Sequence, residues 1–131
     1  MTRRLIRWLL ALFYGIAGVL HLIKPAPFLT IMPPWVPQPE LVVALTGVAE
    51  LAGAIGLIQP VSAAMRRAAG WGLAAYALCV WPANFQHMLI DLTKADGGLG
   101  LGYHLPRPTA QPLLIWLAVW ASRTSAAKAR A

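Results

Sequence analysis

An acidic residue stands in the middle of a long apolar stretch. Glu50 is the tenth residue of the apolar run 41–58, and an acidic or basic side chain at the centre of a bilayer costs about 2.5 to 3.5 kcal/mol on insertion scales. Such a residue should face the inside of a helix bundle. The small residues that share its helical face, at offsets of three and four, are Thr46, Gly47, Gly53 and Ala54. This stripe predicts that a second helix approaches closely, because small side chains let two backbones come together.

Glu50 has two interpretations, and the sequence leaves both open. Ionisable side chains inside a membrane are usually functional, so the carboxyl can be the proton-handling group of a binding site. It can equally be a structural group that ties two helices together through hydrogen bonds.

Other polar side chains lie toward one end of the same apolar segments. His21 ends the run 5–23, and Pro82 predicts a kink in the outer part of the run 68–90, because proline cannot donate a backbone hydrogen bond. We expect one pocket that opens outward between the helices. Its candidate ligand-binding residues are His21, Glu50, Asn84, His87, Arg107 and Gln111.

The histidines and the cysteine give no signature of a metal or haem site. Cys79 is the only cysteine, which excludes an internal disulfide and a cysteine-based metal cluster. The spacing of His21, His87 and His104 fits no known motif, and haem would need matched ligands on facing helices. We therefore expect neither metal nor haem.

The composition is typical of a membrane protein. Of the 131 residues, 59% are apolar and 11% are charged, and the mean hydropathy is +0.63. A soluble domain of this length cannot bury so much apolar surface. The net charge is +7, but the basic residues form short clusters between apolar runs rather than one stripe. We therefore expect the lipid bilayer, and no nucleic acid, as a partner.

The apolar runs predict a single all-α domain, residues 1–131, folded as a bundle of four transmembrane helices. A spanning helix needs about 20 apolar residues. The predicted spans are 5–23, 41–58, 68–90 and 109–122, and the predicted outer loops are 24–40 and 91–108. The first run is kept as a helix, since no small-residue cleavage site of a signal peptide follows it.

Lysine and arginine fall unequally on the two sides of these spans. Eight lie on one side, namely Arg3, Arg4, Arg7, Arg66, Arg67, Arg123, Lys128 and Arg130, and three on the other, namely Lys24, Lys94 and Arg107. By the positive-inside rule the larger group is cytoplasmic. Both termini are therefore expected in the cytoplasm.

Several segments resemble the DoxX-like family of membrane proteins, over nearly the whole chain. The motifs are G-x-x-H ending at His21, P-x-W-x-P-x-P around Trp35, T/S-G-x-x-E ending at Glu50, P-A-N at Asn84 and R-x-x-x-Q-P-L-L-I around Gln111. The sequence departs from the family at residues 108–110, where L-P-L is more usual.

The resemblance implies a multi-pass protein of the bacterial inner membrane, with some relatives acting in quinone-linked oxidation. From it we expect a redox-associated membrane subunit that binds a quinone at Glu50, His21 and Asn84, with electrons moved by a redox partner protein. The alternative is a non-enzymatic module, as a monomer or homo-oligomer, that binds or moves a small lipid-like ligand or supports a complex. No cofactor motif decides whether the protein is an enzyme.

Overall fold

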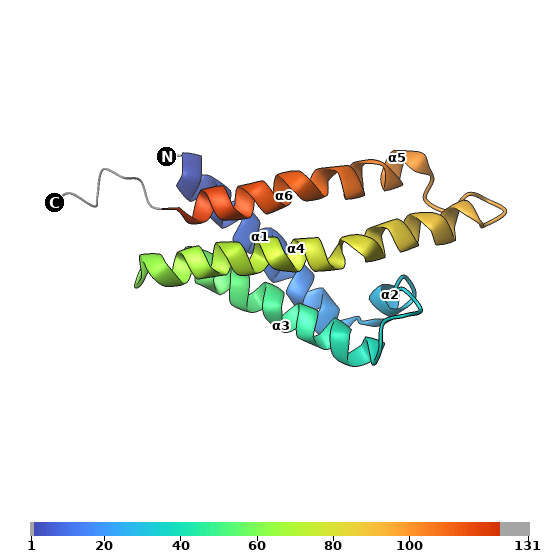
Figure 1. The fold of residues 1–131 in the computed structure, drawn as a ribbon, viewed down its shortest axis with the longest axis horizontal. Helices are drawn as coiled ribbons and strands as arrows, with labels where there is room; N and C mark the ends of the chain where they lie inside the picture. The colour runs from blue at the N-terminus through green and yellow to red at the C-terminus, as the bar shows by residue number, and fades with distance from the viewer. Residues whose placement is uncertain (1, 124–131) are drawn as a thin grey trace.

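Helices form every regular element in the described part of the chain. The computed structural model describes residues 2–123, and no strand occurs among them (Figure 1). The long helices are α1 (Thr2–Ile23), α3 (Pro39–Ile58), α4 (Ala63–Leu92) and α6 (Pro106–Ser122), and the single-turn helices are α2 (Ala26–Leu29) and α5 (Leu101–His104). The all-α prediction is confirmed.

The four long helices pack side by side in a ring. Helix α1 packs on α3, α3 on α4, α4 on α6, and α6 on α1. The start of α1 and the end of α6 lie at one end of the molecule, and the short helices α2 and α5 lie at the other (Figure 1). We call the end with α2 and α5 the outer end, after the loops predicted to lie outside the cell.

The predicted runs all fall inside helices, but the boundaries differ. Helix α4 is 30 residues long and continues through Pro82. It begins after Ser62, whose side chain accepts a hydrogen bond from the backbone N–H of Met65 and so caps the helix. Helix α6 begins at Pro106, earlier than the predicted run, because proline is well suited to the first turn of a helix. The predicted outer loop 91–108 therefore contains α5 and the start of α6.

Glycine allows α1 and α3 to touch through their backbones. A Cβ atom on Gly18 would lie 2.8 Å from the carbonyl oxygen of Gly47, and one on Gly47 would lie 3.0 Å from the carbonyl oxygen of Gly18. The predicted small-residue stripe is correspondingly buried at Gly47, Gly53 and Ala54. Leu10, Tyr14, Leu57 and Leu73 belong to the core formed by the four long helices.

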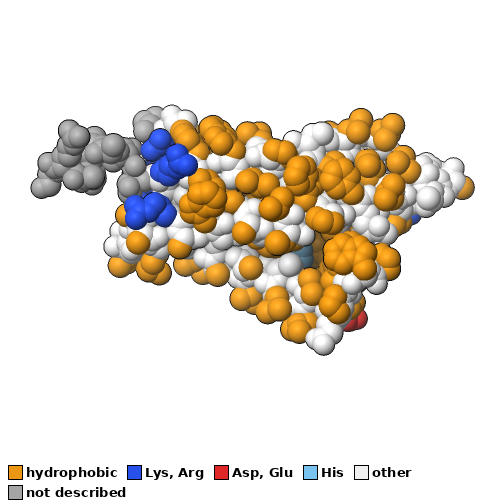
Figure 2. Space-filling view, in the orientation of Figure 1, with side chains coloured by type: hydrophobic (Ala, Val, Ile, Leu, Met, Phe, Trp, Pro, Cys, Tyr) orange, Lys and Arg blue, Asp and Glu red, His pale blue; other side chains and the backbone are white. Residues whose placement is uncertain are grey.

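Two helices within residues 2–123, α1 and α3, are long and apolar enough to cross a membrane. The spans 68–90 and 109–122 stay predictions. Large apolar side chains are nevertheless exposed on all four long helices, and examples are Leu12, Ile16, Leu45, Ile55, Trp71, Leu78, Leu113 and Trp116. Figure 2 shows apolar side chains over most of the visible face, with Lys and Arg gathered mainly where α1 begins and α6 ends.

Candidate functional site

The six candidate residues fall into separate groups. His21 and Glu50 meet between α1 and α3. Asn84, His87 and Arg107 meet at the outer end, between α4 and α6.

Gln111 belongs to neither group. Its side-chain amide donates to the backbone carbonyl of Ala77 over 2.6 Å, and Trp81 donates to the carbonyl of Pro108 over 2.9 Å. Both bonds join α4 to α6. The contacts of Gln111 are therefore those of a residue that holds two helices together.

The group between α1 and α3 is built around Glu50. We call it the acid centre, and it consists of Tyr14, His21, Glu50 and Tyr76. The Glu50 side chain is buried, with only 3% of the residue exposed. Tyr76 donates its hydroxyl to Oε1 of Glu50 over 2.7 Å, and Nδ1 of His21 lies 2.8 Å from Oε2. The ring of Tyr14 packs edge-on against Tyr76. The carboxyl therefore has a different neighbour on each oxygen.

The proton between His21 and Glu50 has two locations open to it. Nδ1 of His21 also lies 2.9 Å from the backbone carbonyl of Ala17, and a ring nitrogen carries at most one proton. When Nδ1 is protonated, it is aligned with the Ala17 carbonyl. When Nδ1 is unprotonated, a 2.8 Å approach to Oε2 requires the proton on the carboxyl. The pair can thus hold one proton at either residue.

One buried atom of the acid centre has unused hydrogen-bonding capacity. The Tyr14 hydroxyl has no hydrogen-bond partner among the described residues, whereas Oε2 of Glu50 meets Nδ1 of His21 at 2.8 Å. Buried polar atoms nearly always have such a partner, and an unpaired one costs about 1 to 3 kcal/mol. The acid centre is therefore suited to bind an additional molecule that forms hydrogen bonds.

The local sequence brings the acid centre together in two ways. The Gly18–Gly47 crossing holds α1 and α3 close enough for the side chains of His21 and Glu50 to meet. At the outer end, Phe28 of α2 stacks on the ring of His21, with ring centroids 3.7 Å apart and planes inclined by 22°. Helix α2 therefore covers the outer side of this group.

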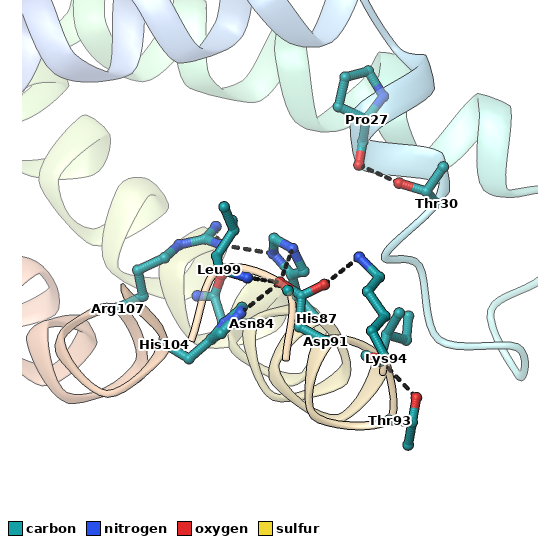
Figure 3. A network of polar contacts seen from close by, with 12 residues as sticks. Pro27, Thr30, Asn84, His87, Asp91, Thr93, Lys94, Leu99, His104 and Arg107 are labelled. Carbon is teal, nitrogen blue, oxygen red and sulfur yellow. Dashed lines mark hydrogen bonds and ion pairs between the residues drawn. The ribbon is translucent and has the colours of Figure 1, made fainter. Parts of the chain in front are cut away.

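The second group, which we call the outer cluster, is built around Asp91 (Figure 3). Asp91 is 1% exposed. Its carboxylate accepts hydrogen bonds from the ammonium of Lys94, from the backbone N–H of Leu99 over 3.0 Å and from Nε2 of His104 over 2.8 Å. These bonds fasten the loop after α4, and helix α5, to the end of α4.

Arg107 joins two predicted residues to this cluster. Its guanidinium donates to Nδ1 of His87 over 2.9 Å and to Oδ1 of Asn84 over 3.1 Å, and it lies over the ring of Tyr103. Nε2 of His87 is 3.7 Å from Oδ2 of Asp91. The outer cluster thus contains three of the six candidates.

Sequence reasoning missed Tyr76 and Asp91 as site residues, and it considered His104 only as a metal or haem ligand, which it did not expect. Tyr76 lies in an apolar run, and nothing in its spacing indicates that it faces Glu50. Asp91 stands four residues after His87, which is a helical spacing that brings the two side chains onto one face. His104 has no such signal, because it reaches Asp91 only through the fold of the intervening loop.

Asp91 and Lys94 lie beyond the predicted span 68–90, and each shifts the pKa of the other. The hydrogen bond from Lys94, with those from Leu99 and His104, lowers the pKa of Asp91 below its ordinary range. The same bond raises the pKa of Lys94. A carboxyl with a lowered pKa stabilises the fold above its unfolded pKa, about 3.9, and this contribution is lost as the pH falls toward the folded pKa.

Asp91→Asn is therefore expected to lower the thermal stability of the protein by several degrees at pH 7. The amide cannot form the charged bond to Lys94, and the difference from wild type should shrink as the pH falls below about 4. Thermal unfolding in detergent, followed by circular dichroism, measures both effects. Asp96→Asn is the control, because Asp96 is exposed. Equal melting temperatures for the two variants at pH 7 would contradict the account of Asp91.

Comparison with protein families identifies the group to which the chain belongs. The model of a family described as a domain of unknown function (DUF8561) matches residues 10–124, so the chain belongs to this family. The resemblance to DoxX-like proteins is wrong. The motifs behind it are short, and the small residues among them recur wherever apolar helices pack closely. Searches of curated proteins and of solved structures gave no significant match.

Proposed function

We propose that this member of the DUF8561 family is a four-helix membrane protein that binds a small amphipathic molecule at its acid centre. The observation that carries the proposal is the buried Tyr14 hydroxyl, which has no hydrogen-bond partner in residues 2–123 and belongs to the same group as the buried carboxyl shared by Glu50 and His21. A head group with a donor and an acceptor would satisfy such atoms. An apolar tail would fit the lipid-like surroundings of the bundle.

The exposed apolar faces support four membrane spans. A soluble bundle covers the apolar side of each helix with neighbouring helices, but here α4 and α6 expose large side chains such as Trp71 and Trp116, as α1 and α3 do. Such apolar faces are stable in contact with lipid. Helices also satisfy their own backbone hydrogen bonds, as a membrane core requires.

The distribution of basic residues supports a cytoplasmic position for the end of the bundle where α1 begins and α6 ends. In residues 2–123, the end where α1 begins carries Arg3, Arg4, Arg7, Arg66, Arg67 and Arg123, and the outer end carries Lys24, Lys94 and Arg107. Lys128 and Arg130, which were counted in the prediction, lie outside the described residues. A bacterial inner membrane is the location proposed on this basis.

A topology experiment tests this orientation. A reporter inserted between Arg66 and Arg67, near the start of α4, is expected to give a cytoplasmic signal, and one inserted at Gly97 an external signal, because basic segments are retained inside. Paired reporters, one active only in the cytoplasm and one active only outside, measure both sites. Reversed signals would contradict the orientation, and cytoplasmic signals at both sites would contradict the third span.

The ligand class follows from the chemistry of the acid centre. A proton held at either His21 or Glu50 lets the pair donate to a carbonyl oxygen or accept from a hydroxyl. A quinone and its reduced quinol present these two groups. In the quinone-linked form of the proposal, Glu50 exchanges protons with the ligand while a partner protein supplies electrons. In the other form, the ligand is a lipid-like alcohol and no electrons move.

A binding experiment with defined probes tests the proposal. A short-chain ubiquinone should quench the tryptophan fluorescence of the purified protein and saturate at one molecule per chain. An alkylbenzene with the same tail, which forms no hydrogen bonds, should fail to displace it. A monoacylglycerol that displaces the quinone with equal affinity would favour the lipid-like form. Absence of saturation, or displacement by the alkylbenzene, would overturn the proposed site.

A further inference from the structure

We propose that His87, Asp91 and His104 bind a divalent transition metal of the zinc class at the outer end of the bundle. The proposal does not depend on the acid centre. It also reverses the expectation that the protein binds no metal. That expectation considered the spacing of the histidines and left Asp91 out.

The positions of the three side chains fit a metal with few changes. One ligand atom from each residue lies within 4.8 Å of the others. Oδ2 of Asp91 is 2.8 Å from Nε2 of His104 and 3.7 Å from Nε2 of His87. Tetrahedral zinc, with bonds of about 2.0 to 2.1 Å, holds its ligand atoms about 3.3 to 3.5 Å apart. The distances between the ligand atoms therefore need only small side-chain rotations.

The fold fixes these ligands before a metal arrives. His87 and Asp91 are four residues apart on α4 and share one face, and α5 brings His104 against them (Figure 3). Asp91 and His104 are each 1% exposed. Two imidazoles and one carboxylate are a ligand set that zinc uses, with the fourth position open to water.

Two cations already face this group and must be accounted for. The Lys94 side chain, bonded to Oδ1 of Asp91, is 52% exposed, so its ammonium can move into water. Arg107 has no acceptor and donates to Nδ1 of His87, which leaves the ring proton of neutral His87 on Nε2. A metal needs that Nε2 free, so binding moves the proton to Nδ1 and releases Arg107 from His87. The proton that Nε2 of His104 donates to Asp91 must likewise move to Nδ1 of the same ring. Both cations therefore compete with the metal.

The competition gives the test an outcome that misfolding cannot produce. Purified protein, first freed of metal with a chelator, is titrated with Zn²⁺ against a coloured zinc indicator. We expect one zinc per chain, and an affinity at least about tenfold lower in His104→Ala and in Asp91→Asn, each of which loses a ligand. Arg107→Gln should bind zinc more tightly than wild type. Asp96→Asn, at an exposed position in the same loop, should match wild type.

Two results would overturn the metal site. One is the absence of stoichiometric zinc binding to the wild-type protein. The other is an unchanged zinc affinity in both His104→Ala and Arg107→Gln, with circular dichroism showing that these variants remain helical. Quinone binding is measured separately, so failure of the acid-centre proposal leaves this result interpretable.

Discussion

Glu50→Gln is expected to remain folded and to lose about tenfold or more of its affinity for the quinone probe. Glutamine keeps the shape of the side chain, and its carbonyl can still accept the hydroxyl of Tyr76. It cannot hold the proton that glutamate shares with His21. A hydrogen bond to a charged group contributes about 1.5 to 3 kcal/mol, which corresponds to at least tenfold in binding.

Glu50→Leu separates this function from a purely structural one. Leucine leaves the buried Tyr76 hydroxyl without its acceptor, so stability should fall by about 1 to 3 kcal/mol. If Glu50 only ties α3 to α4, Glu50→Gln should bind the probe as wild type does, and only Glu50→Leu should be impaired. Glu40→Gln is the matched control, because Glu40 is exposed in the first turn of the same helix. Fluorescence titration and thermal unfolding together measure these effects.

Gly18→Leu is expected to disrupt the bundle, whereas Gly15→Leu should be tolerated. A Cβ on Gly18 would lie 2.8 Å from the carbonyl oxygen of Gly47 and 3.1 Å from the Cβ of Glu50, while a Cβ on Gly15 would meet no atom within 4 Å. Overpacking costs about 1 to 3 kcal/mol and more where backbone must move. Separation of α1 from α3 would also part His21 from Glu50 and abolish probe binding.

The glycine pair makes this comparison a matched one. Both positions are on α1, three residues apart, and both substitutions add the same side chain and remove the same backbone flexibility. Thermal unfolding of the two purified variants in detergent measures the difference. Equal melting temperatures, with probe binding retained in Gly18→Leu, would contradict the close crossing of α1 and α3.

The helices and the buried acid were predictable from the sequence because both depend on local patterns. Long apolar runs without interrupting charges predict helices, and a single carboxyl in such a run must turn inward. The glycine at offset three from Glu50 predicted the close helix contact that the structure contains at Gly47. These inferences need only the periodicity of one helix.

The partners of the polar residues could not be predicted in the same way. Tyr76 reaches Glu50 from another helix, and the rotation of α4 about its axis is set by packing along its whole length. His104 reaches Asp91 through a turn in which Gly97, Gly98 and Gly100 have positive φ, a conformation that no periodic pattern specifies. The six candidates were expected to line one pocket. In the structure they form two separate groups of contacts, and Gln111 joins α4 to α6 instead.

The most direct test of the acid-centre proposal is the identity of what the protein carries when it leaves the membrane. Wild type and Glu50→Gln, extracted in their native lipids and analysed by native mass spectrometry, are compared for bound small molecules. The account predicts one amphipathic molecule with a hydrogen-bonding head group per wild-type chain, and its loss from Glu50→Gln. The same bound molecules in the same amounts on both proteins would contradict it.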